Sequence, residues 1–173
     1  MCLRVSFLQA LAKSYAEMAV DHARLKAPHQ PSRPHWEQPI EAPHLAEVCA
    51  RLDDALEAER LYEQLLPYRD NAILAPVATV CCGAAGRYLG MLASVMGEWI
   101  AAEEHFQAAL DMDERLHAWP WLAHTKHEFA SALLTRGRAR DRNRAKTLLG
   151  EAAASAERIG MPALQQKIRS LTH

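Results

Sequence analysis

The chain of 173 residues has few aromatic side chains, little glycine and none of the β-branched runs that are typical of strands. Phe, Trp and Tyr together make up 6% of it, and glycine occurs 7 times. Alanine and leucine are abundant instead; both have high helix propensities, and small side chains let helices pack closely. The composition therefore predicts an all-α protein, and the length predicts one domain with a substantial core.

The chain also lacks a dominant charge and a long apolar run. Its formal net charge is −1, so no overall field attracts nucleic acid or an anionic membrane. No apolar run approaches the ~18–20 residues that span a bilayer. Residues 4–12 resemble a short signal peptide, but Ser6 and Gln9 interrupt the apolar stretch and helical periodicity continues to Leu25. We expect a cytoplasmic protein without membrane contact, and we do not expect it to bind nucleic acid.

Cysteine is scarce, and its spacing indicates neither a disulfide framework nor a zinc site. Cys2, Cys49, Cys81 and Cys82 include no C-x-x-C pair, and a chain of this size does not need disulfides to fold. The adjacent residues Cys81 and Cys82 allow a redox or soft-metal function. They also lie among small residues in a segment that we predict as helix. There, cysteine packs as a small apolar side chain, which is the interpretation we favour.

A helical-hairpin pattern occupies residues 90–109. Gly90 and Ala102 are predicted to face each other across the hairpin, Gly97 to make its turn, and Phe106 to fill the gap to the next pair. Close approach of two helices requires small residues of this kind. The pattern therefore predicts a pair of antiparallel helices.

The hairpin pattern recurs along the chain. The spacing of Ala102, Phe106 and Ala109 is found in two further triplets, which are Ala58, Tyr62 and Leu65, and Ala145, Leu149 and Ala152. The period is 44 residues from Ala58 to Ala102 and 43 residues from Ala102 to Ala145. Both values exceed the roughly 34 residues of the standard tetratricopeptide repeat, which longer helices or longer links would explain. We predict an all-α, tetratricopeptide-like superhelix of antiparallel helix pairs.

About eight helices are predicted, separated by proline, glycine and other turn residues. They cover residues 5–26, 36–52 (regular after Ala42), 56–66, 76–96, 98–116, 120–136, 141–159 and 163–171. Asp54 is a candidate N-cap, and Pro76 and Pro120 suit first-turn positions. We expect one domain, in which residues 1–35 form an N-terminal helix and a proline-rich linker. Residues 36–159 then form three to four hairpins, and residues 160–173 form a C-terminal capping helix.

Five short segments carry a resemblance to a known protein region. They are residues 61–68 (LYEQLLPY), 86–90 (GRYLG), 102–106 (AEEHF), 120–123 (PWLA) and 160–164 (GMPAL). Together they resemble the C-terminal helical-repeat region of large bacterial signalling proteins. Those proteins join a nucleotide-cyclase or helix-turn-helix output domain to a P-loop ATPase and a long repeat region. The resemblance covers about residues 36–171 and implies the sensor end of such a regulator. The sequence contains no G-x-x-x-x-G-K-[ST] motif, so none of the family's catalytic activities transfers to a residue here.

His124, His127 and Glu128 form the most metal-like cluster in the sequence. On a helix, positions i, i+3 and i+4 share a face, so the three side chains could bind one zinc or nickel ion. His117 or His105 would then be a further ligand. The order of the residues matches neither metalloprotease arrangement. We favour the alternative, a polar helix face with a His–Glu pair, and we expect no cofactor.

Residues 136–146 contain the strongest concentration of positive charge. We predict a basic docking loop that comprises Arg136, Arg138, Arg140, Arg142 and Arg144. Such a run can bind phosphate, but it lacks the interleaved aromatic residues of a single-strand binder. A solvated turn with Asp141 as the N-cap of the next helix explains the same residues. The functional use that we expect is docking onto an acidic partner domain.

The candidate partner or ligand contacts are Arg87, Tyr88, Trp119, Trp121, His124 and Glu128. Trp119 and Trp121 flank a proline in a linker, so the two cannot easily both be buried; Trp121 fits the core better, and Trp119 fits the core or a concave groove equally. Arg87, Tyr88 and Glu128 lie on the first helices of hairpins, which line the concave surface in repeats of this kind.

No nucleophile–base combination is present, because the serines are scattered and no G-x-S-x-G motif occurs. We therefore do not expect an enzyme. The sequence favours an interaction module of a bacterial signalling or regulatory system that binds a protein or peptide, with a homodimer as an open alternative. A second hypothesis is a small-molecule sensor with a pocket near Trp119, Tyr88 and Arg87. A metal-dependent enzyme at His124 and His127 is the third.

Overall fold

The computed structural model describes residues 42–74 and 81–172, and the helix and linker predicted within residues 1–35 lie outside this part. The described elements are α2 (Ala42–Leu52), α3 (Ala55–Leu65), the 3-10 helix η1 (Leu66–Tyr68), β1 (Ala72–Leu74), β2 (Cys81–Ala84), α4 (Ala85–Val95), α5 (Trp99–Arg115), α6 (Trp119–Arg136), α7 (Ala139–Ile159) and α8 (Pro162–Thr172). Helices dominate the described residues, which confirms the all-α class at this coarse level. None of these helices is long and apolar enough to cross a membrane.

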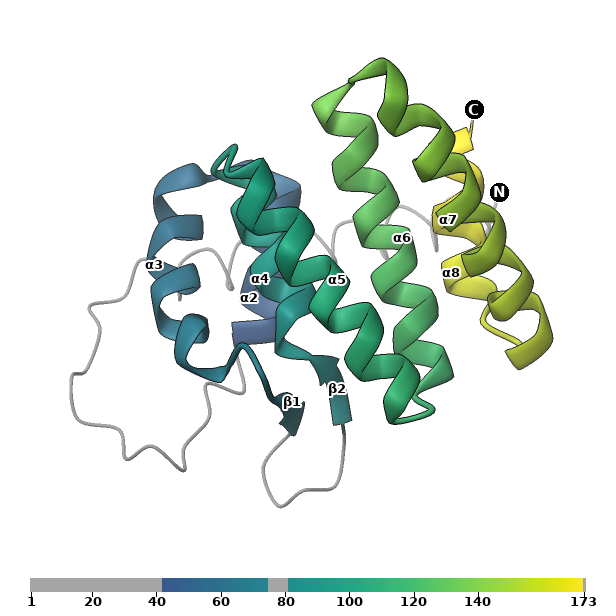
Figure 1. Cartoon of the computed structure of the whole chain (residues 1–173), viewed down its shortest axis with the longest axis horizontal. Coiled ribbons are helices and arrows are strands. Elements are labelled where there is room, and N and C mark those ends of the chain that lie inside the picture. The colour runs from purple at the N-terminus through teal and green to yellow at the C-terminus, as the bar shows by residue number, and fades with distance from the viewer. Residues whose placement is uncertain (1–41, 75–80, 173) are drawn as a thin grey trace, which may run out of the picture.

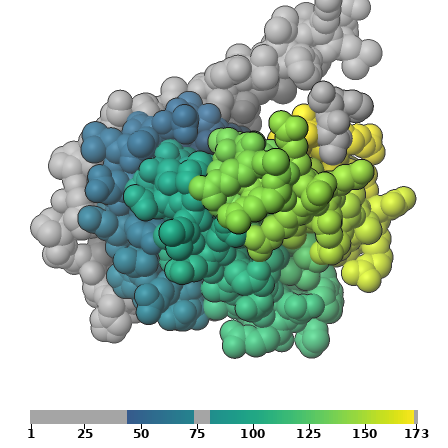
Figure 2. All heavy atoms as spheres, turned by 45° about the horizontal axis from the view of Figure 1, so that its top comes forward, coloured from purple at the N-terminus to yellow at the C-terminus, as the bar shows by residue number. Residues whose placement is uncertain are grey.

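The helices pack as successive hairpins. In each hairpin, two helices pack against each other and are joined by a short turn; the pairs are α2 and α3, α4 and α5, and α6 and α7 (Figure 1). Helices α2, α4, α6 and α8 also contact one another in that order, so they form one layer, and α3, α5 and α7 cover it. Figure 2 shows the same progression over the surface, from α2 and α3 at one end to α8 at the other.

The recurring small residues lie on the covering helices, at the contacts between layers. Ala58 on α3, Ala102 on α5 and Ala145 on α7 are all buried. Phe106, four residues after Ala102, is also buried, and its ring stacks on Phe129 of α6 at 4.9 Å between centroids. The sequence period therefore marks equivalent packing positions on three successive hairpins.

The glycines of α4 pack against α5 one turn further along than the sequence pattern predicted. Gly90 faces Phe106 and not Ala102, since a Cβ at Gly90 would lie 2.8 Å from the Phe106 ring. Gly86 faces the backbone carbonyl of His105, at 2.7 Å from the same kind of Cβ position. Gly97 does make the turn between the two helices, with φ of +77°. The close approach was predicted correctly, but the partner of Gly90 was wrong.

The helix predicted over residues 76–96 is wrong at residues 81–84, and residues 76–80, with Pro76, lie outside the described part. Cys81 and Cys82 belong to β2, which pairs antiparallel with β1 through Ala72 and Ala84. Gly83 in this strand has φ of +86°, and a Cβ there would lie 3.1 Å from the Trp121 ring. The ring of a distant helix and a left-handed glycine thus hold the chain extended, where local propensity favours helix. Both cysteines are half-buried free thiols.

Two of the predicted helix-start residues are confirmed and one is wrong. Asp54 is the N-cap of α3, because its side chain accepts a hydrogen bond from the Glu57 backbone N–H at 3.2 Å. Pro120 lies in the first turn of α6 as predicted. Asp141 is not an N-cap: α7 already begins at Ala139, and the Asp141 side chain pairs with Arg136. The prediction failed because Arg136, near the end of α6, competes for the same carboxylate.

Candidate binding groove

A groove with a volume of about 550 Å³ runs across the layer of α2, α4, α6 and α8. Each helix contributes a triplet at positions i, i+3 and i+4, which share one face of a helix. The triplets are Glu47, Ala50 and Arg51; Met91, Ser94 and Val95; Glu128, Ser131 and Ala132; and Lys167, Ser170 and Leu171. The groove is therefore built from equivalent surfaces of four helices, with Phe106 of α5 and His127 of α6 among its other lining residues.

The triplets form three rows across the helices. One row, Ala50, Ser94, Ser131 and Ser170, is made of small side chains. A second row, the polar row, contains the charged residues Glu47, Glu128 and Lys167, and a third, the apolar row, contains Val95, Ala132 and Leu171. The most buried lining residues are Phe106, His127 and Met91, whereas Ser170 is exposed.

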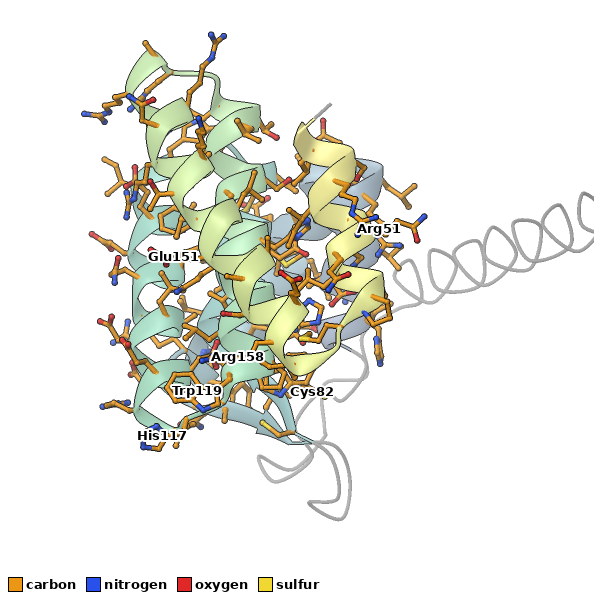
Figure 3. All side chains as sticks on the ribbon, turned by 90° about the vertical axis from the view of Figure 1, so that its right-hand side faces the viewer. Arg51, Cys82, His117, Trp119, Glu151 and Arg158 are labelled. Carbon is orange, nitrogen blue, oxygen red and sulfur yellow. The ribbon has the colours of Figure 1, made fainter. Side chains whose placement is uncertain are left out.

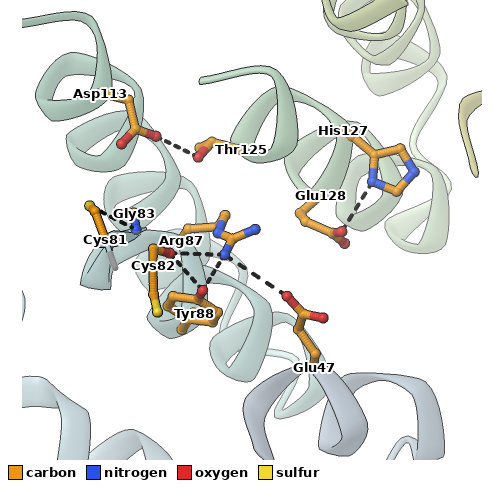
Figure 4. Close-up of polar contacts among 10 residues, drawn as sticks. All are labelled: Glu47, Cys81, Cys82, Gly83, Arg87, Tyr88, Asp113, Thr125, His127 and Glu128. Atoms are coloured by element: carbon orange, nitrogen blue, oxygen red, sulfur yellow. Dashed lines mark hydrogen bonds and ion pairs between the residues drawn. The ribbon is translucent and has the colours of Figure 1, made fainter. Parts of the chain in front are cut away.

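A buried arginine lies beneath the polar row. Arg87 is 1% exposed, and its guanidinium lies 3.9 Å from the Glu47 carboxylate (Figure 4). The same nitrogen donates to the Cys82 carbonyl at 3.2 Å and contacts the Tyr88 hydroxyl. Its plane packs over the rings of Tyr88 and Trp121, at 4.3 and 5.0 Å from their centroids. Arg87 thus supplies a positive charge to the groove from below while remaining inside the core.

Glu128 and His127 form a pair at the groove. His127 Nδ1 lies 3.1 Å from the Glu128 carboxylate (Figure 4). Burial alone would raise the pKa of Glu128, but the hydrogen bond from His127 and the charges of Lys167 and Arg87 hold that pKa below its ordinary value. Glu128 is therefore ionised near neutral pH. The other ring nitrogen of His127, Nε2, is buried and has no hydrogen-bond partner among the described residues.

The structure places only one of the six predicted contact residues, Glu128, in the groove. Arg87 and Tyr88 were predicted on the concave surface, and that is wrong, because both are buried. Helix α4 is covered by α2, α3, α5 and α6, so every residue from Ala85 to Ala93 is buried. Burial raises the pKa of Tyr88 to about 12, and its hydroxyl donates to the Cys82 carbonyl.

The two tryptophans and His124 also lie outside the groove lining. Trp121 packs against Gly83 and Arg87, which agrees with its predicted place in the core. Trp119 is 40% exposed beside His117, and Figure 3 shows this pair at the end of the molecule away from Arg51. His124 faces the Trp121 ring at 5.6 Å.

The described residues do not bring the proposed metal cluster together. No group of three or more His, Cys, Asp or Glu side chains there is arranged to hold a metal ion. His124 turns to Trp121, whereas His127 turns to Glu128. The further ligands considered are engaged elsewhere: His105 bonds to the Tyr62 hydroxyl at 2.8 Å, and His117 lies against Trp119. Burial and the Arg87 charge lower the pKa of His124 to about 4, so its imidazole is neutral.

The predicted basic docking loop is partly internal. Arg136 is buried between Asp141, which it contacts at 2.7 and 2.8 Å, and Glu103, at 2.6 Å. Arg144 pairs with the same Glu103 and packs over the Phe129 ring. Of the five arginines, all except Arg136 are exposed, Arg144 included. Arg136 and Arg144 join α5, α6 and α7, and the sequence alone could not separate these two arginines from the other three.

This internal network predicts an acid-sensitive stability. The hydrogen bond from Arg136 lowers the pKa of Asp141. Burial raises the pKa of Glu103, but its bonds to Arg136 and Arg144 lower it further than burial raises it. A lowered native pKa stabilises the fold above the unfolded-state value of about 4, and this stabilisation is lost as the pH falls below it. We expect Arg136→Met to remove roughly half of the fall in melting temperature between pH 7 and pH 3.

Thermal unfolding by circular dichroism across this pH range measures the effect. Arg138→Met is the matched control, because Arg138 is exposed and also lies in the turn between α6 and α7. The control should keep the acid dependence of the wild type. Equal acid dependence in Arg136→Met and the wild type would show that other carboxylates dominate it.

Sequence reasoning missed most of the groove, including Glu47, Arg51, Ser131 and Lys167. The only shared sequence feature is a small residue at the second position of each triplet, and the triplets follow one another at intervals of 44, 37 and 39 residues from Glu47 through Met91 and Glu128 to Lys167. These unequal intervals do not follow the nearly constant period of the covering helices. Comparisons with protein-family models, with curated proteins and with solved structures find no match to this chain.

Proposed function

We propose that the chain is a non-catalytic, tetratricopeptide-like module that binds an extended peptide segment of a partner protein in this groove. The observation that supports it is the row of small residues, Ala50, Ser94, Ser131 and Ser170, across four helices. Small side chains let a peptide main chain lie close to the helices. Successive side chains of an extended peptide point to opposite sides, so they would meet the polar and the apolar row alternately.

The setting that we propose comes from the resemblance of residues 36–171 to the repeat region of large bacterial signalling proteins. It supports a cytoplasmic, regulatory role in which this chain recognises a partner and another protein carries the output. A second copy of the chain is an alternative partner. No reaction is part of the proposal, because the groove residues form no nucleophile–base pair that would define one.

A small-molecule sensor is a second candidate function, and two observations favour it. The groove volume of about 550 Å³ falls within the range of sites for small organic ligands. His127 lines the groove and has a buried Nε2 without a partner among the described residues, which a ligand group would satisfy. In this case, a ligand from a panel of nucleotides, sugars and amino acids would raise the melting temperature by mass action.

A displayed library of random nine-residue peptides, panned against the purified protein, tests the peptide proposal. We expect enrichment of related sequences whose synthetic versions bind with micromolar affinity or better, as read by fluorescence anisotropy. Ser131→Trp should abolish this binding, because an indole at this half-buried lining position fills much of the groove.

Ser155→Trp is the matched control. Ser155 is also a half-buried serine, but it lies on α7 and does not line the groove. Its substitution should leave peptide binding within about twofold of wild type, and circular dichroism confirms the fold of both variants. Failure to enrich related peptides, or equal binding to Ser131→Trp and the wild type, would reject the proposal. A thermal shift with one small molecule in that case supports the sensor.

A further inference from the structure

We propose that the peptide recognised by this groove carries an aspartate or glutamate side chain that pairs with Lys167, next to an apolar side chain that meets Leu171 and Ala132. This inference rests on the proposed function and specifies its ligand. Lys167 and Leu171 are one turn apart on α8 and both line the groove. A carboxylate and an apolar group on opposite sides of an extended peptide can therefore reach them from one position in the groove.

The carboxylates in the polar row already have interaction partners within the protein. Glu47 faces the buried guanidinium of Arg87 at 3.9 Å. Glu128 accepts a hydrogen bond from His127 and lies near both Arg87 and Lys167. Since these two acids have internal cationic partners, a basic peptide side chain would have to compete with them. The polar row thus offers no free anion at α2 or α6.

Lys167 differs from these two acids because it makes no direct contact with an oppositely charged side chain among the described residues. Its ammonium group forms no hydrogen bond or ion pair within 4 Å in the described part of the chain, although its charge helps to lower the pKa of Glu128. The side chain is half-buried on the α8 side of the groove, where a bound peptide would remove much of its water. A charge in such a place gains most from an opposite charge on the ligand and is penalised most by a like one.

The α2 end of the groove, opposite α8, carries two further charges. Arg51 and Asp53, both exposed, line the groove from the α2 side, and their charges oppose each other. They therefore give no net preference there. Arg51 of α2 and Lys167 of α8 both line the groove. Lys167 is the cation of the polar row and makes no ion pair within 4 Å among the described residues, which is why we assign the acidic contact to α8.

The test compares libraries selected on two proteins. The random nine-residue library is panned in parallel against the wild type and against Lys167→Glu. We expect wild-type selection to enrich an acidic residue beside an apolar one, and the selected peptides to bind Lys167→Glu about tenfold more weakly or worse. Replacing the acidic residue of such a peptide by lysine should restore its binding to Lys167→Glu. Lys146→Glu is the matched control, an exposed lysine on α7 outside the groove, and it should change affinity by less than about twofold.

The outcomes separate this inference from the proposed function. Peptides that Ser131→Trp blocks, but that lack an enriched acidic residue or bind Lys167→Glu as well as the wild type, would overturn the inference and leave the groove function intact. Peptides enriched in lysine or arginine would also overturn it. If no peptide family is blocked by Ser131→Trp, the groove function itself fails. The charge-reversal rescue in particular requires direct contact, because an effect of Lys167 on folding would not be reversed by changing the peptide.

Discussion

Replacing Arg87 with alanine is expected to lower the free energy of unfolding by about 3–5 kcal/mol. The guanidinium is fully buried and packs between the rings of Tyr88 and Trp121, so truncation leaves a cavity there. Glu47 and Glu128 would also lose the cation beneath them. Both effects act at the point where α2, α4 and α6 meet. Urea denaturation followed by circular dichroism measures the change at neutral pH.

A second variant separates the packing of Arg87 from its charge. Arg87→Met fills much of the same volume without the charge, so it should recover part of the loss, and the remainder reports the ionic contribution. Arg142→Ala is the control for removal of an arginine, since Arg142 is exposed on α7, and it should change stability by less than about 0.5 kcal/mol. A loss of less than about 1 kcal/mol in Arg87→Ala would show that the buried guanidinium contributes little to the fold.

Several helix boundaries were predictable because they depend on local chemistry. Asp54 caps α3 through its own side chain, and Pro120 occupies a first turn, where its missing N–H costs nothing. Gly97 and Gly137 adopt positive φ values at turns that end helices. In each case the residue that decides the structure lies within a few positions of the boundary. The hairpin order follows from the same signals.

The failures of prediction have a common physical cause, which is a partner distant in sequence. Cys81 and Cys82 are extended because β1 pairs with them and Trp121 packs on Gly83. Arg87 is an inward arginine because Glu47 and Trp121, both distant in sequence, lie against it. Composition alone assigns an arginine to the surface. No local pattern distinguishes it from an exposed one.

The groove could be predicted only in part. Its triplets follow the spacing of one helix face, but the intervals between the triplets are irregular. The link from α3 to α4 contains η1, β1 and β2, whereas α5 and α6 are joined by only a short turn. This difference shortens the interval from Met91 to Glu128 relative to that from Glu47 to Met91. The constant period of Ala58, Ala102 and Ala145 on the covering helices therefore did not reveal the surface that faces the groove.

A single methyl group added at Gly86 is expected to destabilise the protein by about 2–3 kcal/mol, although alanine is the better helix former. A Cβ at this position would lie 2.7 Å from the His105 backbone carbonyl and 3.4 Å from Ala109. A backbone oxygen cannot rotate away as the end of a side chain can, so α4 and α5 must separate. For a domain of this size, the loss corresponds to a fall in melting temperature of roughly 4–12 °C, which differential scanning calorimetry measures.

The opposite result is expected for Gly150→Ala, which makes the same chemical change inside another helix. Gly150 is exposed in the middle of α7, and its added Cβ would meet nothing within 4 Å. The substitution should therefore stabilise the protein by about 0.5–1 kcal/mol through helix propensity alone. The difference in sign between the two variants isolates the contact between α4 and α5 from the intrinsic preference of glycine. If Gly86→Ala also stabilised the protein, α4 and α5 would not approach each other as closely at Gly86 as the structure has them.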